Sequence, residues 1–444
     1  MDRTVDIMTA SITSRIASIR GRRVWDSRGR PTVEAEVRLA GGALGRAIAP
    51  AGASRGSNEA IDLRDGGAAL GGWGVERALA CVNDEIAKAL AGFDARGQEK
   101  IDETLIALDG TPNKARLGGN AMIAVSMAVL HAAAAAVNQP LWRYLAGDRP
   151  VRMPLPEIQI FGGGAHAGRR VDIQDFMIMP VGASSFDEAM AMCAEVYRHA
   201  GRLMSEAGKS GGVADEGGWW PDFASNEEAL GMLTRSIESA GYRHDQVAIS
   251  LDIAASEFRS ERGYKLGLES RELSSEEWTE ELLGWTRRYP VISVEDPVGE
   301  DDEAGMIRFT RAAGDRLQVI GDDFLVTQAA RVERAAETGA CNAVLIKPNQ
   351  AGTVTETLSA LAAGKKAGFG TIVSARSGET EDTTIVHLAV GWDSGQLKVG
   401  SFARSERMAK WNEALRVEES LGARTSYAGL GALPQHAAPG GASK

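Results

Sequence analysis

The chain has 444 residues, of which 44% are hydrophobic and 25% are charged, and its formal net charge is −11. This length gives room for two or three domains with a large core. The negative charge disfavours a general affinity for nucleic acid or for anionic membranes. The three cysteines are scattered along the chain, so the sequence indicates neither a disulfide framework nor a cysteine-based zinc site, and it favours a cytoplasmic protein.

The N-terminal part is predicted to be an α+β domain over residues 12–146, preceded by a disordered extension at 1–11. Its longest apolar run, 125–137, is too short to cross a bilayer. Strands are expected at 18–24, 31–39 and 45–48, and helices at 75–91, 98–108 and 120–145.

The segment 50–57 follows the third expected strand and consists mostly of glycine and other small residues. Its composition favours a plain surface connection. The alternative is a mobile lid whose backbone can approach a phosphate or a metal ion. The sequence leaves both interpretations open.

The second predicted domain covers residues 150–428, and a flexible tail rich in Gly, Ala and Pro follows at 429–444. Strands are expected at 154–160 and 171–180, and helices at 186–207, 226–240 and 402–421. The second of these strands carries Gln174 and Asp175. A glycine-rich segment at 161–168 could cradle an anion with its N–H groups, although many glycine runs are only turns.

Short apolar runs that end in a polar or charged residue recur between 248 and 398, at intervals of roughly 25 to 45 residues. Buried strands that alternate with helices indicate a parallel sheet covered by helices. If the sheet closes into a barrel, the carboxyl ends of its strands meet in one mouth. The residues at or just after the run ends are Asp252, Glu295, Asp322, Lys347, the group 375–377, and Lys398. Three carboxylates at one place suit Mg²⁺.

Ten motifs, in order along residues 12–421, resemble those of the enolase family, whose members use Mg²⁺ to interconvert 2-phosphoglycerate and phosphoenolpyruvate. They are DSRGRPTVE at 26–34, GAS at 52–54, VDIQDFMIMPVGA at 171–183, DEGG at 215–218, LDIAASEF at 251–258, SVEDP at 293–297, GDD at 321–323, LIKPNQAGT at 345–353, SARSGETED at 374–382 and ARSER at 403–407. The resemblance implies an α/β fold: a modified (β/α)₈ barrel, with its second strand antiparallel, under an N-terminal α+β capping domain.

The resemblance also implies metal ligands and catalytic groups. Asp252, Glu295 and Asp322 look like the ligands of one tight Mg²⁺ site. Ser54 looks like the lid residue that closes on a second Mg²⁺, which binds together with the substrate. The catalytic residues implied are Lys347 as the base that removes the proton next to the carboxylate, Glu216 as the acid that acts on the leaving hydroxyl, and Asp175 beside it.

The substrate implied is a small phosphorylated carboxylate. The residues that we expect to bind it are Lys398 at its carboxylate, Arg376 and Ser377 at its phosphate, and His166, Gln174 and Ser54. A proton next to a carboxylate is very weakly acidic, so divalent metal must spread the charge of the enolate. A lysine base must be neutral, and we expect the metal and the second lysine to lower its pKa.

Two positions near the leaving hydroxyl depart from the family pattern. Ala375 stands where enolases carry a histidine, and Asp175 stands where they usually carry a glutamate. Alanine cannot transfer a proton, and the loss of such a group commonly costs about 10²-fold or more in rate. Trp219 and Trp220 follow the DEGG motif in place of smaller residues, which adds aromatic surface nearby.

This pattern favours a specialised relative, a carboxyphosphonoenolpyruvate synthase of phosphonate antibiotic biosynthesis. Its second substrate would be a nucleotide-activated phosphonoformate, whose base could stack on a tryptophan. One alternative is an ordinary or weakened enolase, and a further one is a non-catalytic binding protein. We expect a homodimer or an octamer, because enolase dimers pair through the DSRG and ARSER regions, which are both present here as Arg28 and residues 404–407.

Overall fold

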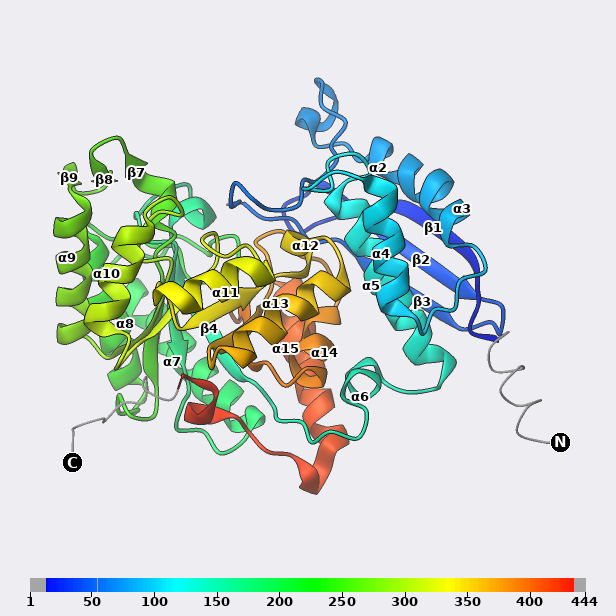
Figure 1. Ribbon diagram of the computed structural model, residues 1–444. Coiled ribbons are helices and arrows are strands. Elements are labelled where there is room, and N and C mark those ends of the chain that lie inside the picture. The colour runs from blue at the N-terminus through cyan, green and yellow to red at the C-terminus, as the bar shows by residue number, and fades with distance from the viewer. Residues whose placement is uncertain (1–12, 54, 435–444) are drawn as a thin grey trace.

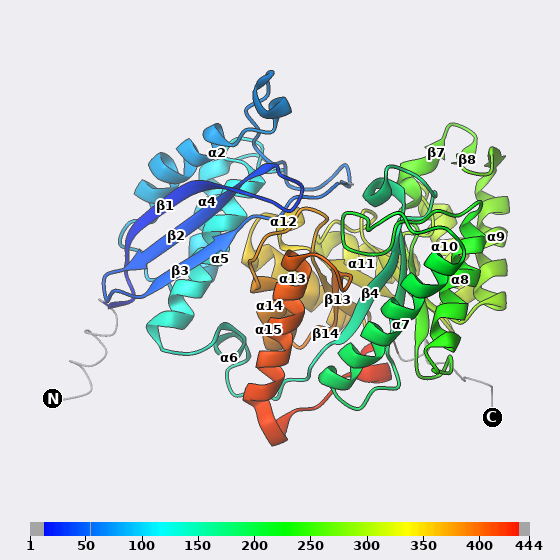
Figure 2. The same ribbon diagram turned by 180° about the vertical axis from the view of Figure 1, so that it is seen from behind.

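The computed structural model describes residues 13–53 and 55–434, so the predicted extension at 1–11 and Ser54 lie outside the described residues. The N-terminal domain is a three-stranded antiparallel sheet with helices on one face (Figures 1 and 2). Its strands are β1 (Ile16–Trp25), β2 (Pro31–Leu39) and β3 (Leu44–Ile48), which confirms the three predicted strands. Helix α5 (Gly119–Ala136) packs closely on the sheet, since a Cβ atom at Gly45 would lie 2.1 Å from the carbonyl oxygen of Ala128.

The predicted single helix at 120–145 is wrong, because the structure has two helices there. Helix α5 ends at Ala136, and the next helix starts only after Pro140, whose ring disfavours a helical conformation in the residue before it. By length and composition α5 could cross a membrane, but 83% of it is buried inside the fold, as in a core helix. Within the described residues, the other α-helices of this domain are α2 (Glu76–Cys81), α3 (Ala87–Leu90), α4 (Gln98–Asp109) and α6 (Leu141–Ala146).

The second domain is a closed eight-stranded barrel, in the order β10-β11-β12-β13-β14-β4-β5-β6. The strands are β4 (Leu155–Gly162), β5 (Asp175–Met179), β6 (Ala248–Asp252), β10 (Val291–Glu295), β11 (Gln318–Gly321), β12 (Ala343–Ile346), β13 (Gly370–Ser374) and β14 (Gly395–Gly400). Strand β5 pairs antiparallel with both neighbours, while the other pairs are parallel. The implied fold, including the reversed second strand, is therefore confirmed.

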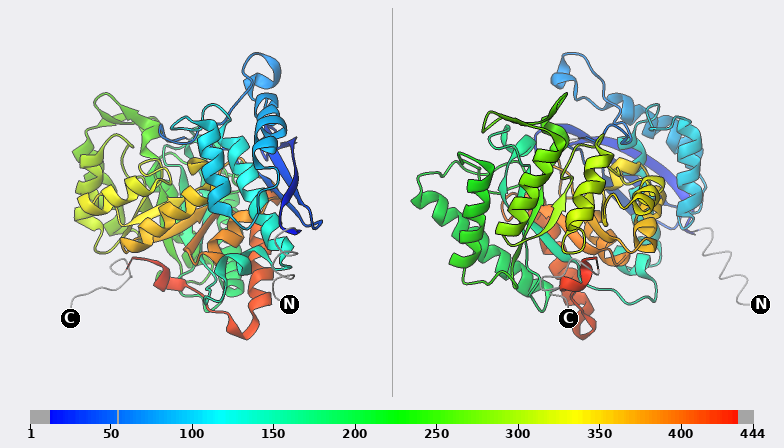
Figure 3. Two further views of the ribbon diagram at one scale, coloured as in Figure 1. Left: turned by 45° about the vertical axis from the view of Figure 1, so that its right-hand side comes forward. Right: turned by 60° about the vertical axis from the view of Figure 1, so that its left-hand side comes forward.

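Helices surround the barrel, as the two views of Figure 3 show. They are α7 (Phe186–Glu206), α8 (Asn226–Ser239), α9 (Ser275–Arg288), α10 (Glu303–Ala313), α11 (Ala329–Thr338), α12 (Pro348–Ala351), α13 (Val354–Lys366), α14 (Thr384–Gly391) and α15 (Ser405–Leu421). Ser185, Ser225 and Ser274 cap the first three of them. A small separate sheet consists of β7 (Arg259–Ser260), β8 (Gly263–Leu266) and β9 (Arg271–Leu273).

Two predictions about the second domain need correction. The strand expected over 171–180 begins only at Asp175, so Gln174 lies just before it. The flexible tail expected from 429 does not begin there, because a 3₁₀ turn over Gly429–Ala432 follows Ala428, and Ala428, Ala432 and Leu433 are buried against the N-terminal ends of barrel strands. The small apolar residues of this segment therefore close the bottom of the barrel.

The capping domain is fixed to the barrel at the first turn of α13. The Oγ atom of Ser126 accepts the N–H of Val354 at 3.0 Å, and the carboxylate of Asp102 accepts both the N–H of Thr355 at 2.9 Å and its hydroxyl at 2.6 Å. Ser126 in turn donates to Asp102 at 2.6 Å. Both residues lie on helices of the capping domain, so this interdomain latch caps a helix of the barrel from outside.

Candidate active site

One cavity opens at the carboxyl ends of the barrel strands, under the loop of the capping domain that precedes Ser54. Nine of the predicted site residues line it: His166, Gln174, Asp175, Glu216, Asp252, Lys347, Arg376, Ser377 and Lys398. Gly52, Ala53, Ser374, Ala375 and Val399 complete the lining. The structure thus brings together residues that are up to 347 positions apart, from Gly52 to Val399. Ser54 itself lies outside the described residues.

Lys398 lies among three acidic side chains of the barrel mouth. Its Nζ is 2.8 Å from Asp252 Oδ2, 2.8 Å from Glu295 Oε2 and 3.7 Å from Asp175 Oδ2. Burial by itself would lower the pKa of Lys398, but these carboxylates outweigh it and raise the pKa well above its usual value. Lys398 is therefore a permanent cation in the cavity wall.

Lys347 forms a close ion pair with Asp322 and is also almost fully buried. Burial lowers the pKa of Lys347, but Asp322 more than offsets this, so that the pKa is raised. The neutral form expected of a base is thus disfavoured while Asp322 pairs with it. Any cation that shares the charge of Asp322 would weaken this pair and favour neutral Lys347.

The carboxylates that pair with Lys398 and Lys347 suit a divalent cation. Burial, followed by the charge of Asp252, raises the pKa of Glu295 well above its usual value, and Glu295 Oε1 has no hydrogen-bond partner. Gln174 Oε1 is buried and unpartnered in the same way. Buried oxygen acceptors without donors are the chemistry that a hard cation satisfies. The residues present therefore fit Mg²⁺.

Sequence reasoning missed two acidic residues beside this group. Oxygen atoms of Asp296, Asp322 and Asp323 all lie within 4.8 Å of one another. Asp296 accepts the N–H groups of both other residues, at 2.9 and 2.8 Å, and so orients Asp322. Burial and the charge of Asp322 raise the pKa of Asp296 to about 8. The only signal in the sequence was their position next to Glu295 and Asp322.

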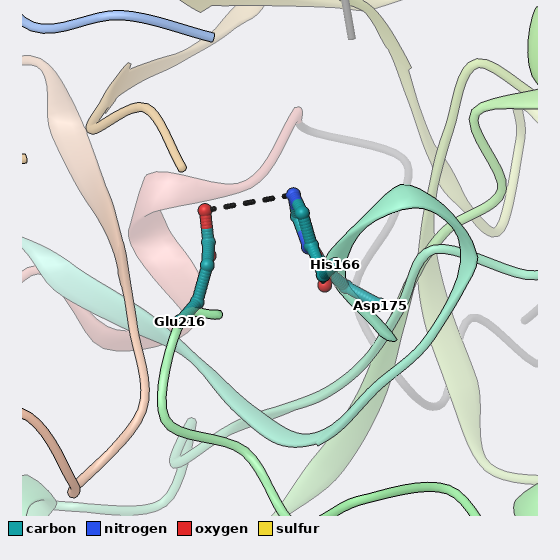
Figure 4. A group of neighbouring side chains, drawn as sticks. All are labelled: His166, Asp175 and Glu216. Atoms are coloured by element: carbon teal, nitrogen blue, oxygen red, sulfur yellow. Dashed lines mark hydrogen bonds and ion pairs between the residues drawn. The ribbon is translucent and has the colours of Figure 1, made fainter. Parts of the chain in front are cut away.

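On the opposite wall His166 lies between two carboxylates (Figure 4). Its Nδ1 is 2.9 Å from Asp175 Oδ1, and its Nε2 is 3.8 Å from Glu216 Oε1. Burial would lower the pKa of His166, but Asp175 and Glu216 raise it to about 9. Burial would raise the pKa of Asp175, but His166 lowers it to about 2. At neutral pH this wall therefore presents an imidazolium held by an ionised Asp175.

Arg376 is paired with a residue of the capping domain that sequence reasoning missed. Its Nη1 lies 3.0 Å from Glu59 Oε2 and 3.1 Å from Asn349 Oδ1. Glu59 also accepts the N–H of Gly56 at 3.1 Å, which ties the loop around Ser54 to the barrel. Arg376 thus keeps an anionic partner at the place where we expect a phosphate.

The two tryptophans do not line the cavity. The Trp219 ring stacks on Tyr197 with centroids 4.8 Å apart, and its Nε1 donates to the Tyr197 carbonyl at 2.9 Å. A Cβ atom at Gly211 would lie 2.9 Å from the ring of Trp220. Both rings therefore pack away from the cavity, and the expected aromatic surface beside the leaving group is wrong. Ala375, in contrast, lies in the cavity wall as expected.

Comparison with known proteins agrees with this architecture. Residues 16–145 match the family description "Enolase, N-terminal domain", and residues 150–435 match "Enolase, C-terminal TIM barrel domain". Among curated proteins, "Enolase 1" of Desulfitobacterium hafniense (strain Y51) is 49% identical over 421 residues, which cover 94% of this chain and 96% of that protein. Together with the eight-stranded barrel and its cavity of lysines and carboxylates, these matches show that the chain belongs to the enolase family.

Proposed function

We propose that this enzyme interconverts 2-phosphoglycerate and phosphoenolpyruvate by removing the proton at C2 and expelling the hydroxyl at C3. Members of its family are carbon–oxygen lyases that act on small phosphorylated carboxylates and generally use Mg²⁺. The observation that carries the proposal is the cavity in which a lysine, Lys347, and a carboxyl group, that of Glu216, lie on different walls. Lys347 follows β12, whereas Glu216 lies on the turn between α7 and α8.

The cavity residues divide the work between the two ends of the substrate. Lys398 offers a fixed ammonium to the substrate carboxylate, and Arg376 offers a guanidinium whose fork suits a phosphate. Substrate phosphate would replace Glu59 at Arg376, which releases the loop of the capping domain from that contact. Ser377 adds a hydroxyl donor at the same end.

Proton transfer follows from the positions of Lys347 and Glu216. Neutral Lys347 takes the proton from C2, and Glu216 gives a proton to the C3 hydroxyl, which leaves as water. The imidazolium of His166, 3.8 Å from Glu216, adds positive charge where the hydroxyl leaves. Asp252, Glu295 and Asp322 would hold Mg²⁺, which supplies the positive charge that stabilises a doubly charged enolate.

A second candidate is the specialised reaction with an activated phosphonoformate. It is supported by Ala375 in the cavity wall, where the family resemblance implies a histidine, and by Asp175, which is shorter than the usual glutamate. The tryptophans no longer support it, because neither ring reaches the cavity. Similarity to a protein named enolase over nearly its full length favours the first candidate.

One experiment separates the two candidates. Purified full-length protein is incubated with 2-phosphoglycerate and Mg²⁺, alone and with an activated phosphonoformate, and products are followed by phosphorus NMR. The first proposal expects phosphoenolpyruvate from 2-phosphoglycerate alone. Product that appears only when the phosphonoformate is present would replace it with the second candidate, and no product in either tube would contradict both.

A further inference from the structure

Gln159 on β4 bridges the two sides of the leaving-group wall, although it does not itself line the cavity. The residue is only 1% exposed. The Nε2 group donates to Asp175 Oδ1, and Oε1 accepts the backbone N–H of Gly218 at 2.8 Å. Asp175 holds the ring of His166, and Gly218 belongs to the turn that carries Glu216. A single amide is therefore bonded to the carboxylate that holds the His166 ring and to the turn that carries Glu216.

The chemistry of Asp175 and of the Gly218 N–H calls for a side chain between them that has both a donor and an acceptor. Ionised Asp175 can only accept hydrogen bonds, and the N–H of Gly218 can only donate one. A neutral amide offers a donor group on one side and an acceptor on the other, in the matching order. A carboxylate at position 159 would face Asp175 with like charge, and an apolar side chain would take the acceptor from the N–H of Gly218 and leave Asp175 with His166 but without the amide donor.

The backbone around the Gln159 amide leaves space for it. A Cβ atom at Gly218 would lie 2.5 Å from Gln159 Oε1, and one at Gly162 would lie 3.0 Å from the same oxygen. Two glycines, one in the DEGG turn and one at the end of β4, therefore leave room for the amide. Tyr197 secures the other side of the turn, since its hydroxyl donates to the Gly217 carbonyl at 2.9 Å.

We propose that Gln159 is a positioning residue for departure of the hydroxyl: it sets the distance between the His166 ring and the Glu216 carboxylate. This inference rests on the proposed function and concerns only the second half of that reaction. Proton removal at C2 depends on Lys347, which follows β12 on another side of the barrel and has no hydrogen bond or ion pair to Gln159 among the described residues. A loss of Gln159 should therefore separate the two halves of the reaction.

The test compares Gln159→Met with wild-type enzyme in D₂O. Exchange of the C2 proton of 2-phosphoglycerate is measured by proton NMR, and product formation is measured in the same tube. We expect product formation to fall about 100-fold, the size expected for a misplacement of roughly 1 Å. We expect the rate of C2 exchange to stay within a few-fold of the wild-type rate.

A second variant tests the donor–acceptor argument. In Gln159→Glu, a protonated carboxyl restores one donor and one acceptor, whereas the ionised form faces Asp175 and, behind it, His166. Product formation by this variant, relative to wild type, should fall as the pH rises through the pKa of the new carboxyl. The ratio for Gln159→Met should not depend on pH in this way.

Gln396→Met is the matched control, because Gln396 is a buried glutamine at the opposite end of the barrel. It should lower thermal stability but leave both rates of the folded enzyme unchanged. Equal losses of exchange and product formation in Gln159→Met, or no loss of either, would overturn the positioning role. A wild-type enzyme that catalyses neither process would instead contradict the proposed function.

Discussion

The two ends of the barrel are both lined by polar side chains, but their hydrogen bonding differs. At the bottom, the amides of Gln318 and Gln396 bond to each other in both directions, at 2.9 and 2.8 Å, and Ser293 accepts a further bond at 3.1 Å. At the mouth, buried charges face one another, and Glu295 Oε1 and Asp175 Oδ2 have no hydrogen-bond partner. The bottom satisfies its own polar groups, whereas the mouth keeps acceptors available for a ligand.

This difference shows which end of the barrel stabilises the fold and which end keeps polar groups without partners for the sake of function. A buried amide pair with all its groups bonded stabilises a single arrangement of strands. A buried carboxylate without a donor costs free energy until a cation or substrate arrives. Changes at the mouth should therefore affect turnover and ligand dependence, and changes at the bottom should affect stability alone.

The largest effect is expected for the base. Lys347→Met should lower kcat by about 10³- to 10⁴-fold, because no other side chain in the described cavity can take the C2 proton in its place. Steady-state rates with saturating Mg²⁺ provide the measurement, with circular dichroism to show that the fold is kept. A variant that retains a tenth of the wild-type rate would remove Lys347 from the proposed role.

A large effect on stability is expected at Glu157, which lies on β4 inside the barrel between the two ends. It is fully buried, Ser250 donates to it at 3.0 Å, and its Oε1 has no partner. Burial raises its pKa from 4.5 to about 7, although the charge of Lys398 lowers it. The folded state therefore binds this proton more tightly than the unfolded state does.

The stability of the protein should depend on pH through the protonation of Glu157. The stabilisation that protonated Glu157 gives is complete below its unfolded pKa and is lost as the pH rises through about 7. Glu157→Gln removes this loss, so its stability relative to wild type should increase by about 3 kcal/mol between pH 4 and pH 8. Urea unfolding at several pH values measures it, and a constant difference would show that Glu157 does not titrate in this range.

Mg²⁺ should stabilise the protein only by binding at the mouth of the barrel. At 100 times its dissociation constant, Mg²⁺ should raise the free energy of unfolding by about 2.7 kcal/mol, and EDTA should reverse this and abolish turnover. The Asp322→Asn variant should lose most of this Mg²⁺-dependent increase in the free energy of unfolding. Gln318→Met at the bottom should keep it in full, and an equal loss in the two variants would mean that the ion binds elsewhere.

The smallest effect is expected at the bottom. Gln396→Met leaves Gln318 with an unpaired donor and acceptor, which should cost about 1–3 kcal/mol of unfolding free energy. Turnover by the folded variant should equal that of wild type. A fall in kcat without a fall in stability would show that the two ends of the barrel are not independent.

The barrel and part of the site could be predicted from short local patterns, whereas the reversed second strand and most of the site residues came from the family resemblance. Asp252, Glu295 and Lys347 end apolar runs or directly follow them, and parallel strands in a closed barrel bring such positions together. The pairing between them could not be predicted. That Lys347 pairs with Asp322 depends on side-chain geometry across the barrel, which no spacing in the sequence encodes.

The residues that the sequence prediction missed or misplaced also have physical explanations. Glu59 comes from the other domain and carries no motif that points to Arg376. Trp219 was misplaced because the chain turns sharply at Gly217, whose φ is +93°, and directs the next residues toward α7. The composition of residues 429–444 predicts a flexible tail, yet small residues in its described part, such as Ala432, fit the narrow bottom of the barrel, and residues 435–444 lie outside the described residues.

The interdomain latch makes the folding of one domain depend on the other. Helix α13 relies on Ser126 and Asp102 of the capping domain for two of its first N–H groups, which a barrel synthesised alone would leave without those acceptors. The two domains should therefore unfold in one cooperative transition, although each has its own sheet. A chain that loses the capping domain would lose a well-formed helix next to β12, the strand that directly precedes Lys347.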